Sequence, residues 1–178
     1  MTADRSPAAG ASRAEEAPAA RPAAGVSLGH RELADADHWI LSLTPAPVLA
    51  CTHLVREPFP HVAISLVGGP VPLPATEASL RSAADTAAAG GLGRAVVFPG
   101  VEHLIGTLSV AEVLASSAID EVVVLGGGSP APQMLVETGD FVRPQYRAGK
   151  LILTTMPAVG GRLVPFESRN PTPCCAAH

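Results

Sequence analysis

The sequence predicts an α/β fold: a single domain with a mostly parallel central sheet (a βαβαβ core), an antiparallel C-terminal hairpin and a disordered N-terminal tail. Three apolar runs rich in β-branched residues, 61–67, 94–98 and 119–125, are typical of buried strands. Helix-forming stretches separate these runs, and a helical crossover makes the strands that it joins parallel. The 178 residues, 47% hydrophobic and 16% charged, suffice for one core.

The composition also sets the domain limits. Residues 1–26 are rich in Ala, Pro and Gly and contain no large apolar side chain before Val26. Such a stretch cannot bury enough surface to offset the entropy lost on ordering, so we expect it to be disordered. The α/β domain is expected over 27–168, and 169–178 forms a C-terminal tail that carries Cys and His.

The first elements are short. Residues 29–37 predict one or two helical turns, and WILSL (39–43) predicts a strand that the TPAP breaker ends. VLACTHLV (48–55) predicts a second strand. After the buried strand HVAISLV, Thr76 stands where an N-cap is expected, and the helix that follows, 77–89, stops at GGLG.

The middle of the chain contains a capping signal. Residues 99–107 predict a loop. Ser109 and Glu112 then form the S-x-x-E pattern of a capping box, which predicts a helix over 110–118.

The last part of the chain has a different pattern. Residues 133–138 predict a short strand or helix, and 139–150 predict a loop. Two β-rich runs, 151–158 and 162–167, are joined by VGG and predict an antiparallel hairpin. Each run contains a proline, which places the hairpin at a sheet edge.

Each predicted parallel strand ends in glycine. Ligands of open α/β sheets bind outside the carboxyl ends of the strands, where glycine lets the backbone approach an anion closely. The plain alternative is that short turns need glycine for positive φ. The sequence therefore predicts a ligand site at Gly68, Gly69, Gly100, Gly126, Gly127 and Gly128, with Ser129 as a cap or an anion contact.

Basic residues gather late in the chain and outnumber the acidic residues around them. This excess predicts an anionic small-molecule ligand, with Arg143 and Arg147 as its counter-charges. The alternative is a solvated basic face.

Glu102 and His103 follow the strand RAVVF. An adjacent carboxylate and imidazole at the carboxyl edge of a sheet are candidates for general acid and base catalysis. The alternative is a solvated charge beside a surface histidine. The sequence leaves open whether the protein is an enzyme.

Cysteine and histidine occur close together at two places. Zinc, or another transition metal, prefers four thiolate and imidazole ligands. The sequence predicts a candidate set in Cys51, His53, Cys175 and His178, with Cys174 as an alternative donor. A reactive thiol tail and an inert tail are the other two interpretations.

The leading functional hypothesis is a small-molecule binding protein or enzyme with its site at the glycine loops. The alternatives are a metal-binding or thiol-dependent protein that acts through the Cys and His residues, and a non-catalytic partner-docking protein that forms homo-oligomers or docks. A net charge of −4 argues against nucleic acid as a partner. No apolar run reaches the roughly 18–20 residues of a membrane span, so we expect no membrane partner and a cytoplasmic location.

Overall fold

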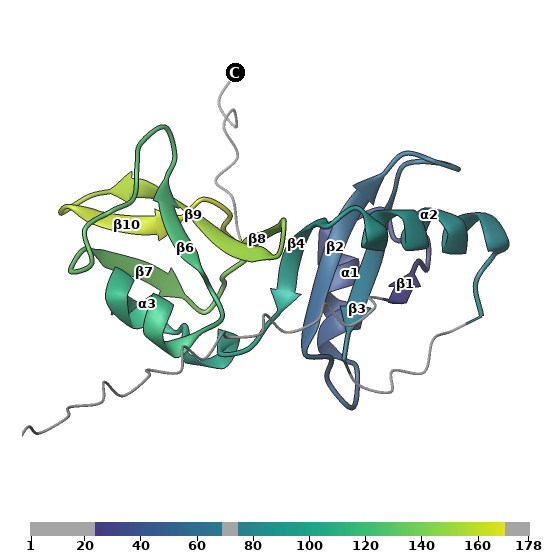
Figure 1. The fold of residues 1–178 in the computed structure, drawn as a ribbon, viewed down its shortest axis with the longest axis horizontal. Helices are drawn as coiled ribbons and strands as arrows, with labels where there is room; N and C mark the ends of the chain where they lie inside the picture. The colour runs from purple at the N-terminus through teal and green to yellow at the C-terminus, as the bar shows by residue number, and fades with distance from the viewer. Residues whose placement is uncertain (1–23, 69–74, 170–178) are drawn as a thin grey trace, which may run out of the picture.

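The structure is a computed structural model that describes residues 24–68 and 75–169. Two lobes lie side by side in Figure 1. The N-terminal lobe (24–97) is purple to teal, and the C-terminal lobe (98–169) is green to yellow. The strands β4 and β8 pair with each other and join the lobes.

The N-terminal lobe is an antiparallel sheet with two helices. Its strands lie in the order β1-β3-β2-β4, and every neighbouring pair is antiparallel. The elements are β1 (Ala24–Val26), α1 (Leu33–Leu41), β2 (Leu49–Val55), β3 (His61–Val67), α2 (Ala78–Ala89) and β4 (Leu92–Val97).

Strand β3 is the centre of this lobe. It is buried from His61 to Leu66 because helices cover both faces of the sheet, with α2 in front and α1 behind in Figure 1. Since side chains alternate along a strand, Val62, Ile64 and Leu66 share one face, and they form a cluster with Ala36 and Ile40 of α1. Exposed polar residues therefore do not alternate with the apolar ones of β3, because this strand lies between the layers formed by α1 and α2.

The opposite face of the sheet of the N-terminal lobe packs closely against α2. Gly25 of β1 lies directly under this helix, where an added Cβ would overlap the backbone of Ala84. The absence of a side chain at Gly25 thus lets the edge strand pair with β3 beneath α2.

The C-terminal lobe is a mixed sheet around the long strand β9. That strand pairs antiparallel with β8 and β10 and parallel with β6, while β7 pairs with β10 and β5 with β7. The elements are η1 (Val101–His103), β5 (Gly106–Ser109), α3 (Val110–Ser116), β6 (Glu121–Val124), β7 (Leu135–Gly139), β8 (Gln145–Arg147), β9 (Lys150–Ala158) and β10 (Arg162–Pro165).

The two lobes share hydrophobic packing. The core cluster of the C-terminal lobe includes Leu153, Leu163 and Val113, and it also contains Cys51 of β2 and Ala95 of β4. The lobes are therefore connected through side chains as well as through the β4–β8 pairing.

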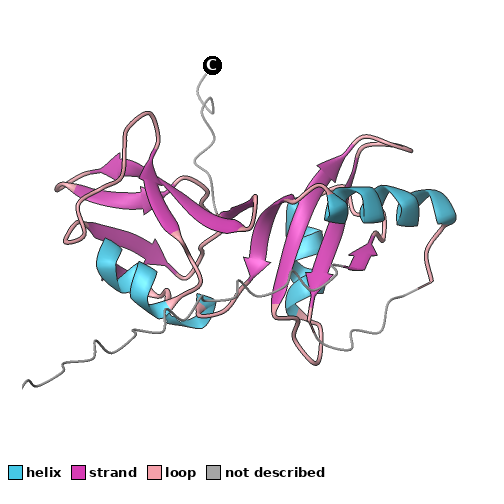
Figure 2. Cartoon of the chain, viewed as in Figure 1, coloured by secondary structure: helices cyan, strands magenta, loops and turns pink. Residues whose placement is uncertain are grey.

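The predicted mostly parallel βαβαβ core is wrong. Strands predominate in both lobes (Figure 2), and seven of the nine strand pairings in the described residues are antiparallel. The crossover through α2 does make β3 and β4 parallel in direction, because both are antiparallel to β2. The two strands are not neighbours, since β2 folds back from its hairpin with β3 and lies between them. The third predicted strand, β6, pairs with β9 in the other lobe.

Several local predictions are also corrected. WILSL is not a strand. Trp39, Ile40 and Leu41 form the last turn of α1, and Ile40 is buried on the same side of this helix as Ala36. The predicted loop 139–150 contains β8, and the predicted loop 99–107 contains η1 and the start of β5. Helix α2 has Glu77 rather than Thr76 at its N-cap.

Other local predictions are confirmed. Residues 49–55 form β2, and the C-terminal hairpin forms as β9 and β10. Its predicted place at a sheet edge is wrong, because β9 also pairs with β8 and β6, and β10 also pairs with β7. The capping box is present, since the Ser109 hydroxyl accepts from the Glu112 amide at 3.2 Å and the Glu112 carboxylate accepts from the Ser109 amide at 2.7 Å. None of the helices in the described part of the chain is long and apolar enough to cross a membrane.

Candidate functional site

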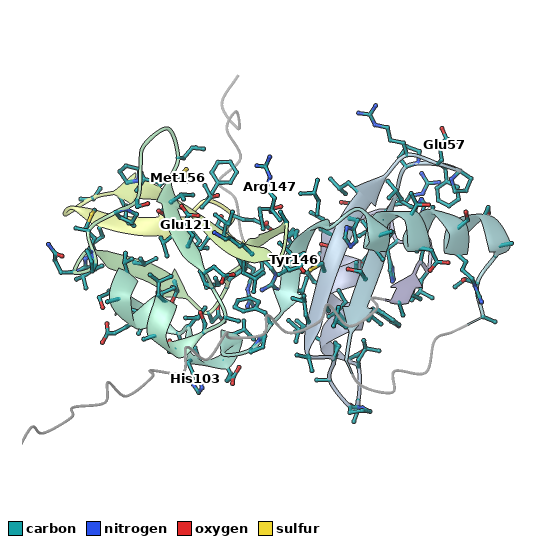
Figure 3. The ribbon with its side chains drawn as sticks, in the orientation of Figure 1. Glu57, His103, Glu121, Tyr146, Arg147 and Met156 are labelled. Carbon is teal, nitrogen blue, oxygen red and sulfur yellow. The ribbon has the colours of Figure 1, made fainter. Side chains whose placement is uncertain are left out.

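The predicted acid and base pair lies on the surface. Gly100, with φ of 81°, starts the single turn η1, which carries Glu102 and His103. The Glu102 carboxylate lies 3.5 Å from the His103 Nε2, and the two side chains are 66% and 62% exposed. His103 is at the lower edge of the C-terminal lobe in Figure 3. Water solvates both groups, and their assignment to catalysis stays a prediction.

The glycine loops lie in different surroundings. Gly68 follows β3 and Gly100 follows β4, the strands on either side of β2, whereas Gly126, Gly127 and Gly128 follow β6, which pairs with β9. An added Cβ would meet Val48 at Gly68 and the backbone of Ser116 at Gly100, but nothing within 4 Å at Gly126. Ser129 is exposed beside the third loop, and Gly69 lies outside the described residues. The fold therefore separates the third loop from the first two.

The two arginines predicted as counter-charges, Arg143 and Arg147, lie in different surroundings. Arg147 is exposed on β8 and lies at the upper edge of the C-terminal lobe in Figure 3. The side chain of Arg143 is 8% exposed and bonds to a carboxylate of the other lobe, Asp37. Arg143 thus leads to a buried charged site that the sequence pattern does not predict as a whole.

This site is an arginine network between the lobes. Asp37 of α1 accepts from Nη1 of Arg94 at 2.7 Å and from Nη2 at 3.0 Å. The same carboxylate accepts from Nε of Arg143 at 3.0 Å. Glu167, which follows β10, accepts from Nε of Arg94 at 2.7 and 2.8 Å. Two carboxylates and two guanidiniums from four separate segments therefore meet at one place.

Local structure explains the position of each group. Asp37 follows Ala36 on the buried face of α1, and Arg94 alternates with Ala95 along β4, so that it faces the helix. Thr52 of the neighbouring β2 accepts from Nη1 of Arg94 at 3.3 Å. Every side-chain nitrogen of Arg94 thus has an acceptor, as a buried guanidinium requires.

Arg143 is compensated less completely than Arg94. Its Nε donates to Asp37 and its Nη1 to the backbone oxygen of Val142, and no acceptor among the described residues is assigned to its Nη2. Burial lowers the pKa of Arg143, Asp37 opposes that effect, and the charge of Arg94 adds to the lowering. Burial also opposes the charge on Arg94, but Glu167 and Asp37 outweigh it, and the pKa of Arg94 is raised.

A cleft of about 370 Å³ opens onto this network. Its charged lining comprises the guanidiniums of Arg94, Arg143 and Arg169 and the carboxylates of Asp37 and Glu167. The rest of the lining is largely apolar and comes from one face of α1 and from the segment before β8, with Leu33, Ala34, Leu41 and Phe141. We call this hollow the arginine cleft.

Phe141 holds the two outer arginines near each other. The guanidinium carbon of Arg143 lies 4.2 Å from the centroid of the Phe141 ring, and that of Arg169 lies 5.6 Å from it. Both distances are within the range of a cation–π contact. Arg169 also pairs with Asp140 at 3.3 Å, in an exposed position at the rim.

Cys51 and His53 lie on one face of β2, two residues apart. The Ser65 hydroxyl on β3 is 2.8 Å from Nε2 of His53. Burial raises the pKa of the Cys51 thiol to about 12, although a hydrogen bond with Ser65 lowers it, and burial lowers the pKa of His53. The thiol is therefore protonated at neutral pH.

The other predicted metal ligands, Cys174, Cys175 and His178, lie outside the described residues. Within 24–68 and 75–169, no three His, Cys, Asp or Glu side chains gather where they could hold one metal ion. The zinc hypothesis stays a prediction.

Comparison with family models, with curated proteins and with solved structures finds no match to this chain. Sequence reasoning finds Arg143 through the basic excess but misses Asp37, Arg94 and Phe141. The available signals are an acid among apolar residues in 33–41 and an arginine at the start of the apolar run 94–98, which indicate buried charges that need partners.

Proposed function

We propose that the protein binds an anionic small molecule in the arginine cleft. The observation that supports this proposal is the position of Arg143, a buried guanidinium that shares its one carboxylate with Arg94 and lines a cleft. A buried charge is costly unless it is paired and hydrogen bonded. Solvent reaches Nη2 of Arg143 at the cleft, and a bound anion would accept its hydrogen bonds there in place of water.

The cleft has the size and chemistry of a small-molecule site. Its volume of about 370 Å³ falls in the range of roughly 300–1,000 Å³ that is usual for ligand pockets. Guanidiniums bind carboxylates and phosphates through paired N–H groups and are therefore common in anion sites. With Asp140 at the rim, three carboxylates balance the three guanidiniums, so support for an anion comes from the donors of Arg143 that face the cleft and not from net charge.

Thermal unfolding with a panel of anions tests the proposal. Acetate, butyrate, octanoate and inorganic phosphate are titrated against the full chain at constant ionic strength. A ligand that binds the native state adds RT ln(1 + [L]/Kd) of stability, about 2.7 kcal/mol at one hundred times Kd, so at least one anion is expected to raise Tm in a saturable way.

Two variants test whether the anion binds in the arginine cleft. Arg143→Gln removes the incompletely paired cation, while Asp37 keeps its bonds to Arg94, so the variant is expected to fold and to lose the Tm response. Arg147→Gln removes an exposed arginine outside the cleft and is expected to keep it. Equal responses in both variants, or no response to any anion in the native chain, would overturn the proposal.

A further inference from the structure

The chemistry of the cleft also indicates which kind of anion it binds. We infer that the ligand is a monocarboxylate that carries an apolar group, such as an aliphatic chain, rather than a phosphate. This inference rests on the proposed function, because it concerns the same cleft. It follows from the charge, the donors and the apolar lining of the cleft.

The charge of the cleft favours a single negative charge. Arg94 is already paired with both Asp37 and Glu167. Arg169, at the rim, is paired with Asp140. Arg143 is the cation of the cleft that is buried and shares its one carboxylate with another arginine, Arg94. A phosphate dianion at this place would lie close to the carboxylates of Asp37 and Glu167, and like charges in a buried site repel strongly.

The donors left on Arg143 are few. Nε and Nη1 each already donate one hydrogen bond, to Asp37 and to Val142. One N–H group of Nη1 and both N–H groups of Nη2 remain, and the Phe141 ring lies beside them, with its centroid 4.2 Å from the guanidinium carbon. A carboxylate needs few donors, whereas a phosphate offers three strongly accepting oxygens that this arrangement does not satisfy.

The wall next to Arg143 is apolar. Leu33, Ala34 and Leu41 come from positions of α1 that share a face with Asp37, and the Phe141 ring adds to this surface. Leu41 is 62% exposed although it lines the cleft. An apolar group attached to the carboxylate would cover this wall and remove the exposed surface from water, which is favourable.

A series of carboxylates of increasing length tests the inference. Dissociation constants are measured by calorimetry for acetate, butyrate, hexanoate and octanoate, and for inorganic phosphate and octyl phosphate. If the chain lies on the apolar wall, each buried CH₂ group contributes ~0.8 kcal/mol, which tightens binding about fourfold per CH₂. Octanoate is expected to bind more tightly than octyl phosphate, and acetate more tightly than inorganic phosphate.

Two variants show whether the chain lies on α1. Leu41→Ser removes part of the wall at an exposed position, so the fold is kept and the gain in affinity with chain length is expected to shrink. Leu135→Ser changes an exposed leucine of β7 outside the cleft and is expected to keep the full gain.

The outcomes separate the two proposals. If no carboxylate and no phosphate binds, or if binding survives Arg143→Gln, the proposed function fails. If phosphate binds at Arg143 at least as tightly as the matching carboxylate, the proposed function holds and the inferred ligand class is wrong. The inferred class is also wrong if affinity does not rise with chain length, or if Leu41→Ser leaves that rise unchanged.

Discussion

Two charged sites of this molecule contrast with each other. Glu102 and His103 are adjacent in the sequence, 3.5 Å apart and about two-thirds exposed. Arg94 and Asp37 are 57 residues apart in the sequence, yet they are joined at 2.7 Å and are each 10% exposed. Adjacency in the sequence gives a pair that water solvates, while the tertiary fold gives a pair that is buried and fully hydrogen bonded.

The difference shows which charges matter to the fold. An exposed ion pair contributes about 0–1 kcal/mol, because water and salt screen it. Breaking a buried pair costs about 3–5 kcal/mol, because the remaining charge stays buried without a partner. The arginine network is also built from both lobes, so its loss affects how the lobes are joined.

The largest expected effect is that of Asp37→Asn. The change leaves both Arg94 and Arg143 without their shared charge, and we expect the free energy of unfolding to fall by about 3–5 kcal/mol. Urea denaturation measures the difference. Glu102→Gln is the control and is expected to change the free energy by less than about 0.5 kcal/mol. Similar effects of the two substitutions would break the contrast between the sites.

A smaller effect is expected at the turn that carries the exposed pair. In Gly100→Ala the new methyl group overlaps the backbone of Ser116 and the residue must keep φ of 81°. Overpacking costs about 1–3 kcal/mol and the left-handed conformation about 1–2 kcal/mol, so a total loss of about 2–5 kcal/mol is expected.

Gly126→Ala is the matched control for this turn, because Gly126 also has positive φ, 72°, but has no atom within 4 Å of the added group. It is expected to cost about 1–2 kcal/mol. Thermal unfolding of the two variants gives the comparison. A larger cost at Gly126 would show that packing against Ser116 is not what requires glycine at 100.

The smallest effect concerns Cys51, a buried group without charge. Burial raises its pKa from the ordinary thiol value of 9.0 to about 12, so folding keeps the proton on the thiol. Stability from this group is complete well below pH 9 and is lost as the pH rises toward 12, by about 1.4 kcal/mol at pH 10. Urea denaturation at pH 8 and pH 10 measures this loss in a Cys174→Ser/Cys175→Ser background.

A Cys51→Ser variant in the same background separates this loss from other alkaline effects, since serine does not titrate in this range. We expect it to lose less stability between the two pH values than the chain that keeps Cys51. A thiol reagent at pH 8 is also expected to label Cys51 only after unfolding. Rapid labelling of the folded chain would show that Cys51 is accessible.

The sequence predicts local structure better than it predicts pairing. The run HVAISLV forms a buried strand, and the S-x-x-E pattern forms the expected capping box, because both depend on residues a few positions apart. WILSL is misread as a strand because a short apolar run has the same appearance in a strand and at the end of a helix. Only its packing with Ala36 on the buried face of α1 distinguishes the two.

The candidate site is predicted from the sequence only in part. The late basic excess points equally to Arg143, whose side chain is buried, and to Arg147, which is exposed on β8. Which of the two is buried depends on the packing of 141–143 against α1, and no local pattern describes that packing. The glycine loops predict turns correctly, but the strands before them are distributed over two lobes.

The sequence by itself determined the strands and helices whose signals are local: the strands β2 and β3, the capped helix α3 and the hairpin of β9 and β10. Only the tertiary structure decided that β2 separates β3 from β4, that β6 joins β9, and that Asp37 meets Arg94 and Arg143. The physical reason is that periodicity, caps and turns act over a few residues. Strand pairing and buried ion pairs join segments far apart in the chain, and the burial of both partners selects them.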